Sequence, residues 1–468
     1  MHFDKTSSRR QFLKGSLGAA ASGFPAIVPS RVLGRSAPSN LIQVAQIGCG
    51  RIARDSEFRG ILRNSDGARY VAVCDLDTLR IADAKNLLEQ AYAQKFGVGK
   101  YAEIKTYRDY REMLQDKGID AVCISTPDHW HAQQAMEAAL AGKDIYLQKP
   151  ASLTIKEGRQ MADTIKRTGR IFQQGSQQRS EYEFRYACEL VRNGRIGKVQ
   201  QVFIGLPADP SGIEEPEMPV PSNLNYEMWL GSTPLVYYTE KRVHPQAADM
   251  HTRYGRPGWL RCEQFGAGMI TGWGAHHIDI AHWAMDTEYS GPVEIVASAE
   301  FPKKGLWNVH GAFHVGATYA NGAVVYISEK YPTGVKFIGE DGWIWVTRGD
   351  VKPGDLAAGK PRIAALDASD LKMLRAGIKD NGIHLHHSPK NDHHLDWLTS
   401  IKTRKPPAAP AEVGHRSCTA CLLAHAAMKL DRELKWDPKT ERFLNDDEAN
   451  SLLSRKQRAP YGTDYVLA

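Results

Sequence analysis

The chain has 468 residues, of which 42% are hydrophobic and 24% are charged, as in an ordinary globular protein. Its net charge of +7 is unevenly placed, because residues 1–39 hold six lysines and arginines against one aspartate. The remainder is close to neutral and has no basic stripe to neutralise phosphates, which argues against a nucleic-acid partner. No apolar run reaches the roughly 18 residues that a membrane-spanning helix needs, so we expect no stable membrane insertion.

The N-terminal segment reads as an export address. Residues 7–15, SSRRQFLKG, carry Arg9 and Arg10 in the order typical of a twin-arginine signal, which serves proteins that cross the bacterial inner membrane already folded. The apolar stretch that follows is too short to span a bilayer. We therefore expect residues 1–39 to be a signal and linker, and the protein to be periplasmic. The alternative is an ordinary disordered, basic N-terminus.

From residue 40 the pattern alternates between short apolar runs and helical stretches. Near-continuous apolar strands separated by helices indicate a parallel sheet covered on both faces. The fold class is therefore α/β, with a Rossmann-type, doubly wound parallel sheet over residues 40–170. Its strands are expected at 41–48, 70–75, 121–126 and 144–148, with a further one at 170–175, and its helices at 53–64, 78–96 and 131–142.

Beyond residue 170 strand-like segments follow one another with little helix between. This texture predicts a second, α+β domain over residues 171–410 with a large, mostly antiparallel sheet. Residues 232–268, rich in Tyr, Arg, His and Gly, are expected to form a long functional loop. Residues 411–468 should form a helix and a tail that pack back on the body. The expected strands lie at 197–206, 292–301, 311–320, 323–330 and 335–346.

The cysteines and histidines are candidate metal ligands or disulfide partners. Seven scattered cysteines make no disulfide framework, and the Cys418-x-x-Cys421 pair has no second pair nearby. Residues 384–397 hold five histidines, but no matching carboxylate or cysteine constellation accompanies them. We therefore expect no functional metal.

A dinucleotide cradle is the first site. Gly48, Gly50 and Ala53 form G-x-G-x-x-A between the first strand and the first helix, where glycines allow a tight turn and close approach to a pyrophosphate. Asp75 ends the second strand 22 residues after Ala53, placed to bind both ribose hydroxyls of an adenosine. A carboxylate there would repel a 2′-phosphate, so NAD is favoured over NADP.

Further motifs make the chain resemble the Gfo/Idh/MocA family of oxidoreductases, from about Leu41 to the C-terminus. They lie at 125–150 (STPDHWHAQQAMEAALAGKDIYLQKP) and 266–285 (GAGMITGWGAHHIDIAHWAM). The resemblance implies sugar, cyclitol or glycoside substrates and a homo-oligomer, a dimer or tetramer, built through the second sheet. It also implies the set of cofactor contacts, which is Gly48, Cys49, Gly50, Arg51, Ile52, Asp75, Ser125, Thr126, Pro127, His131, Gln148 and Lys149.

The resemblance also assigns catalytic groups. The family's Glu-Lys-Pro motif falls on 148–150, so its lysine is Lys149 and its glutamate is replaced by Gln148. The family's catalytic histidine falls on His276, with His277 as the competing choice, and the family carboxylate four residues earlier is replaced by Gly272. Substrate contacts are expected from Lys149, Arg179, Trp273, His276 and Asp279, the last also a possible partner that orients the histidine.

The chemistry suits these residue types. Oxidation of a secondary alcohol requires a base for the hydroxyl proton, for which histidine is suited, and a cation such as lysine to stabilise the developing alkoxide. Three functions stay open. The preferred one is a dehydrogenase that converts a ring hydroxyl, in the favoured case at C3, to a ketone. The second is a redox-neutral glycoside hydrolase that acts by oxidation and elimination, and the third is a non-catalytic sugar-binding or sensor protein.

Overall fold

A computed structural model of the protein describes residues 41–348, 365–375 and 377–467. The expected twin-arginine signal lies outside these ranges. Within them, no helix combines the length and the apolar character that crossing a membrane would require. All seven cysteines lie in the described part of the chain, where each is buried and free of a disulfide.

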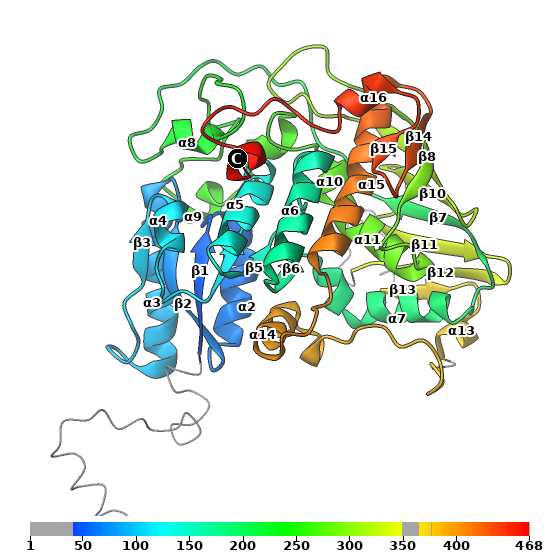
Figure 1. The fold of residues 1–468 in the computed structure, drawn as a ribbon, viewed down its shortest axis with the longest axis horizontal. Coiled ribbons are helices and arrows are strands. Elements are labelled where there is room, and N and C mark those ends of the chain that lie inside the picture. The colour runs from blue at the N-terminus through cyan, green and yellow to red at the C-terminus, as the bar shows by residue number, and fades with distance from the viewer. Residues whose placement is uncertain (1–40, 349–364, 376, 468) are drawn as a thin grey trace, which may run out of the picture. The chain divides into compact units, whose positions relative to one another are not determined.

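The first sheet confirms the predicted doubly wound architecture. It has six strands in the order β3-β2-β1-β4-β5-β6, and every neighbouring pair is parallel (Figure 1). The order reverses between β1 and β4, and in such folds ligands bind at the carboxyl ends of the strands beside this reversal. The strands are β1 (Ile42–Ile47), β2 (Ala68–Cys74), β3 (Lys105–Tyr107), β4 (Ala121–Ile124), β5 (Asp144–Leu147) and β6 (Phe172–Gln174), the last lying just past the boundary expected at residue 170.

Helices alternate with these strands, as a parallel sheet requires. The central strands β4 and β5 are buried at every residue because helices cover both faces of the sheet. The helix that follows β1 contains one π-helical turn, η4 (Ala53–Glu57), before it continues as α2 (Phe58–Arg63). The remaining helices of this domain are α3 (Thr78–Phe96), α4 (Tyr110–Leu114), α5 (Asp128–Leu140) and α6 (Ile155–Thr168).

The second sheet has nine strands in the order β13-β12-β11-β7-β10-β9-β8-β14-β15. Its described pairs are antiparallel except β7 with β10, which confirms the predicted mostly antiparallel sheet. The strands are β7 (Val199–Gly205), β8 (Pro292–Ala299), β9 (Phe313–Tyr319), β10 (Val324–Ser328), β11 (Gly334–Gly339), β12 (Gly342–Val346), β13 (Leu366–Ala368), β14 (Leu434–Asp437) and β15 (Arg442–Phe443).

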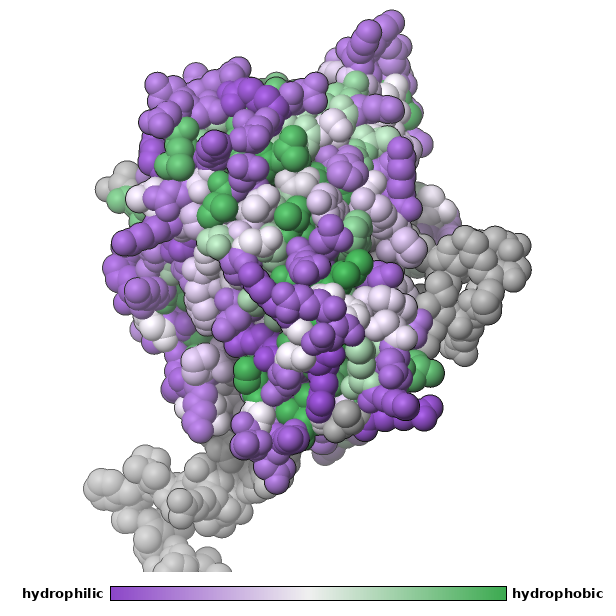
Figure 2. Space-filling view, turned by 90° about the vertical axis from the view of Figure 1, so that its right-hand side faces the viewer, coloured by the Kyte–Doolittle hydropathy of each residue, from purple (hydrophilic) through white to green (hydrophobic). Residues whose placement is uncertain are grey.

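One face of this sheet is covered and the other is partly open. In β10 the side chains alternate between buried and half-buried, the pattern of an antiparallel strand with one packed face. Figure 2 views the molecule from the side on which this sheet lies and shows small hydrophobic patches scattered over a largely hydrophilic face. Phe203 and Tyr326 are both half-buried and stack with ring centroids 5.2 Å apart.

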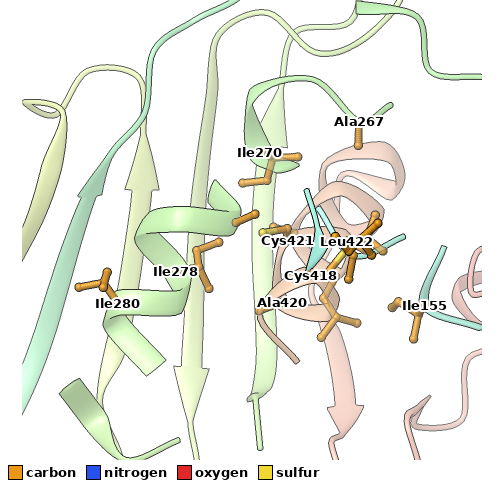
Figure 3. Close-up of a cluster of buried hydrophobic side chains, with 14 of the residues drawn as sticks. Ile155, Ala267, Ile270, Ile278, Ile280, Cys418, Ala420, Cys421 and Leu422 are labelled. Atoms are coloured by element: carbon orange, nitrogen blue, oxygen red, sulfur yellow. The ribbon is translucent and has the colours of Figure 1, made fainter. Parts of the chain in front are cut away.

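Helix α15 (Ala411–Leu430) joins the two domains, because it packs against α6 of the first and against α11 and β8 of the second. Figure 3 shows Cys418, Cys421 and Leu422 of this helix gathered in one buried cluster that includes Ile278 of α11. The other helices are η5 (Gln177–Ser180), α7 (Tyr182–Arg192), α8 (Tyr226–Leu230), α9 (Met250–Arg253), η6 (Gly258–Arg261), α10 (Met269–Gly272), α11 (Gly274–Met285), α13 (Leu371–Arg375), η7 (Pro389–Asn391), α14 (His393–Thr403), α16 (Asp447–Ser451) and α17 (Thr463–Val466).

Candidate active site

The glycine turn after β1 has no room for a side chain. Gly48 has a φ of +82°, and a Cβ there would lie 2.8 Å from the carbonyl oxygen of Ser125. The Gly48 N–H donates to the carbonyl of Cys74 at 2.8 Å, which ties the turn to the end of β2. The turn therefore brings bare backbone and the following helix N-terminus to the edge of the sheet, as phosphate binding requires.

Asp75 links this turn to the second strand. Its Oδ2 accepts the N–H of Cys49 at 2.7 Å and its Oδ1 accepts the N–H of Asp77 at 2.9 Å. Burial raises the pKa of Asp75, while the charge of Arg80 acts in the opposite direction. The carboxylate is thus held in a fixed orientation beside the cleft, with lone pairs left for ribose hydroxyls.

One cleft runs from this turn to the lysine motif. Residues of both domains line this cleft. Most of the residues that the sequence predicts as cofactor contacts are among them. Cys49 is fully buried and contributes only its backbone N–H to Asp75. Expected residues in the lining are Gly48, Gly50, Arg51, Ile52, Asp75, Ser125, Thr126, Pro127, His131, Gln148 and Lys149. The second domain adds His244, Gly255, Pro257, Trp259 and Leu260.

His131 connects two loops beside Lys149, at one end of this cleft. Its Nε2 lies 2.8 Å from the carbonyl oxygen of Thr126, and its Nδ1 lies 2.6 Å from that of Pro150. Burial lowers the pKa of His131 to about 4, so the neutral ring donates to one of these carbonyls at a time. The histidine clamps backbone and does not present a free nitrogen to the cleft.

Lys149 brings the two family motifs together. Its Nζ donates to the carbonyl of Gly272 at 2.9 Å, four residues before His276. Burial lowers the pKa of Lys149, and the carboxylate of Asp128, which lines the same cleft, opposes that shift. The lysine therefore stands where the cofactor cleft meets the second domain.

The two adjacent histidines have different surroundings. His276 is 6% exposed and its Nδ1 has no hydrogen-bond partner. Burial and the charges of Arg348 and Lys149 hold the pKa of His276 well below its usual value, so the ring is neutral. His277 is 1% exposed and its Nδ1 lies 3.2 Å from the carbonyl oxygen of Gly205, within the core. Of the two, His276 has a ring nitrogen without a hydrogen-bond partner, but that nitrogen is buried. Neither histidine is among the residues that line the cleft described above.

The other expected substrate contacts divide. Arg179 and Asp279 form a buried ion pair, with Nε–Oδ2 at 2.6 Å, and Ser417 donates to the second oxygen of Asp279 at 2.7 Å. Neither residue lines the cleft described above, because each satisfies the other's charge in the interior. Trp273 is partly exposed, and the guanidinium of Arg348 lies 5.2 Å from its ring centroid.

A segment of the second domain, residues 239–261, covers the adenosine end of the cleft. His244 and Gln246 contact Oδ2 of Asp77 at 3.0 and 2.9 Å. Arg253 donates to Asp83 on α3 at 2.8 Å. The sequence marked this segment as functional from its composition, but the partner residues on α3 gave no signal of their own.

Sequence reasoning also missed Asp128 and Glu57. Asp128 is 3% exposed beside Lys149, and Glu57 is fully buried behind Gln148. A charged residue at the start of a predicted helix is an ordinary pattern, so neither position stood out. Within the described ranges, no group of three or more histidine, cysteine, aspartate or glutamate side chains is arranged to hold a metal ion.

The chain resembles known sugar-related and inositol-related proteins over part of its length. The chain is 32% identical over 157 residues to scyllo-inositol 2-dehydrogenase (NAD(+)) of Bacillus subtilis, covering 34% of this chain and 42% of that protein. It is 33% identical over 180 residues to glycosyl hydrolase family 109 protein 2 of Shewanella sp. strain ANA-3, covering 35% and 38%. The chain thus matches less than half the length of each relative.

Solved structures share the fold. The WlbA dehydrogenase of Bordetella pertussis, solved with NADH and UDP-GlcNAcA, superposes with a TM-score of 0.57 at 15% identity, covering 84% of this chain and 98% of that one. The aldose-aldose oxidoreductase of Caulobacter crescentus, solved with glycerol, gives 0.56 at 16% identity, covering 84% and 99%. At these identities the likeness concerns the fold alone.

Family descriptions cover most of the chain. The NAD-binding Rossmann fold of an oxidoreductase family matches residues 42–176, and the C-terminal alpha/beta domain of the same family matches residues 211–463. The glycine turn without room for a side chain and the fixed Asp75 carboxylate fit an NAD cofactor. The chain therefore belongs to the Gfo/Idh/MocA family of oxidoreductases, and its first domain is an NAD-binding Rossmann domain.

Proposed function

We propose that the protein is an exported, NAD-dependent oxidoreductase that oxidises a secondary hydroxyl group of a sugar or glycoside to a ketone, with C3 as the favoured position. The hydrogen bond from Lys149 to the Gly272 carbonyl carries this proposal, because it joins the lysine motif to the segment that holds His276. Lys149 lines the cofactor cleft directly.

The residues divide the chemistry between them. NAD bound in the cleft supplies the hydride acceptor. Lys149 would hold the oxygen of the reacting hydroxyl and stabilise the alkoxide that develops as hydride leaves the carbon. His276, neutral and with an unpartnered nitrogen, would accept the hydroxyl proton. Gly272 stands where the resembling family has a carboxylate, so no negative charge at that position raises the basicity of the ring.

Export gives the cofactor a special status. A protein with a twin-arginine signal folds in the cytoplasm before export. Because the dinucleotide cradle exists only in the folded chain, the protein would leave the cytoplasm with NAD already bound. Little free NAD is expected outside the inner membrane, so the cofactor must be regenerated in place by a second substrate or an external carrier. The half-buried Phe203 and Tyr326 on the open face of the second sheet support a homo-oligomer formed there.

The match to a family 109 glycosyl hydrolase favours one second candidate. In such a reaction, transient oxidation would acidify the neighbouring C–H, the glycosidic bond would break by elimination, water would add to the resulting unsaturated ketone, and the hydride would return to the carbonyl carbon. The net result is hydrolysis with no change in the cofactor's redox state, and the same Lys149 and His276 would serve it.

The first test is the cofactor content of protein purified from the native periplasm without added NAD. After denaturation, about one NAD(H) per chain is expected, and the intact holoenzyme should change absorbance at 340 nm with an oxidisable sugar. Free sugar released from a glycoside without net NADH would identify the hydrolase. Folded protein with an empty site would overturn loaded export, and sugar binding without turnover, unchanged in Lys149→Ala and His276→Ala, would mark a binding protein.

A further inference from the structure

A buried carboxylate lies directly behind the lysine motif. Glu57 is 0% exposed, and its Oε1 accepts a hydrogen bond from Nε2 of Gln148 at 2.6 Å. Its Oε2 accepts a hydrogen bond from Oγ of Ser125 at 2.9 Å. These two partners are the first residues after the adjacent strands β5 and β4, so one carboxylate joins both strand ends beneath the cleft.

The local backbone is unusual at this position. Glu57 is the last residue of the π-helical turn η4, which the N–H of Phe58 closes by donating to the carbonyl of Ala53. A π-turn inserts one extra residue into a helix and rotates the side chains that follow, and such turns are frequent at functional sites. Here it directs the carboxylate of Glu57 into the interior.

This burial is costly and poorly compensated by charge. Burial raises the pKa of Glu57 to about 7, although the hydrogen bonds from Gln148 and Ser125 act in the opposite direction. In the described part of the chain, the ion-pairing side chain within 4.0 Å is His394, whose buried Nε2 has no hydrogen-bond partner. A neutral histidine repays little of the desolvation of a carboxylate. The buried carboxylate of Glu57 therefore adds little to folding stability. Its two hydrogen bonds are the better explanation for its presence.

One of those two hydrogen bonds comes from a residue where this chain departs from its family. Gln148 stands where the family motif has a glutamate, immediately before Lys149. The Oε1 of Gln148 lies 3.3 Å from the N–H of Lys149 and accepts from it. Its amide therefore spans the gap between the carboxylate of Glu57 and the backbone of Lys149.

We propose that Glu57 supplies, from the neighbouring helix, the carboxylate that Gln148 no longer provides, and so acts as a positioning residue for Lys149. Its role is to hold the amide of Gln148, which sets the backbone at 148–150 and with it the reach of Lys149 to Gly272. The proposal rests on the proposed function, since that assigns Lys149 its task, but the structural part of it is tested without turnover.

The test exchanges the two side chains. Four holoenzymes are compared: the wild type, Glu57→Gln, Gln148→Glu and the double exchange. Glu57→Gln should lower kcat about tenfold with little change in KM, because a small misplacement of a catalytic group is costly. Gln148→Glu should give the lowest melting temperature, since two carboxylates would then face each other at 2.6 Å. The double exchange restores one carboxylate and one amide and should return kcat to within about threefold of the wild type.

Amide hydrogen exchange gives a readout that needs no substrate. Peptides covering residues 147–152 should exchange faster in Glu57→Gln and regain wild-type rates in the double exchange. Glu189→Gln is the matched control, because it removes another buried carboxylate, paired with Arg185 on α7, and should leave residues 147–152 unchanged.

Two results would overturn the proposal. One is a Glu57→Gln protein with wild-type kcat and wild-type exchange at residues 147–152. The other is a double exchange no better than the worse single variant in both readouts. A wild type without turnover on any sugar would defeat the proposed function, whereas the exchange pattern would still decide the role of Glu57.

Discussion

The two halves of the active site are built in different ways. In the Rossmann half, several residues that line the cleft follow the end of a strand, as Gly48 follows β1, Asp75 follows β2 and Ser125 follows β4. In the second-domain half, His276 lies inside a buried helix, and its neighbours come from separate loops and strands. The first half is therefore a local consequence of strand and turn, while the second depends on long-range packing.

The largest expected effect breaks the Rossmann half. Gly48→Ala should reduce bound NAD to below about a tenth of the wild-type amount, because the new Cβ would meet the Ser125 carbonyl at 2.8 Å in a left-handed backbone position. NAD released on denaturation measures this directly.

Gly142→Ala separates strain from collision. Gly142 has a similar φ of +78°, but a Cβ there meets nothing within 4 Å. This variant should lose about 1 kcal/mol of folding stability and keep its NAD. Equal NAD loss in both variants would mean that backbone strain, and not the crowded turn, explains the defect.

The next effect tests the second-domain half. His276→Gln should lower kcat by about 10²-fold or more with NAD content unchanged, since it removes the base that we propose. His277→Gln should keep most of the activity and lower the melting temperature by a few degrees, because it loses the contact to the Gly205 carbonyl and the edge-to-face packing on the Trp273 ring. A larger loss of kcat in His277→Gln would reverse the assignment.

The features of the fold and the site that can be predicted from the sequence divide in the same way. The parallel sheet, the mostly antiparallel second sheet and the glycine turn follow from local patterns of apolar runs and turn residues. Arg179 and Asp279 were expected at the substrate, yet they neutralise each other across 100 positions of sequence. Glu57 gave no signal, because its partner Gln148 lies 91 residues away and a π-turn aims it inward. Pairings of this kind depend on the assembled core.

A smaller effect asks whether the second domain helps to retain the cofactor. Arg253→Ala removes the hydrogen bond to Asp83 that holds residues 239–261 over α3. A charge-assisted hydrogen bond of this kind contributes about 1–2 kcal/mol, so NAD should dissociate about tenfold faster. Dissociation of NAD from the diluted holoenzyme measures this.

Arg432→Ala is the control for that variant. It removes an ion pair to Asp446 in the C-terminal segment and should leave the dissociation rate of NAD unchanged. If Arg253→Ala releases NAD no faster than Arg432→Ala does, residues 239–261 do not hold the cofactor in place.

The smallest effect concerns the positive charge of Arg348, which lies just beyond the end of β12. Burial is the main cause of the lowered pKa of His276, and the charge of Arg348 is the next. Arg348→Met should raise that pKa. Because a base acts in its neutral form, the acid limb of the pH–kcat profile should then move to higher pH. Lys336→Met removes another cation from this sheet, one stacked 4.3 Å from the Trp343 ring centroid, and should leave the limb in place. An acid limb that stays in place in Arg348→Met, or that moves equally in Lys336→Met, would show that the charge of Arg348 does not act on the base.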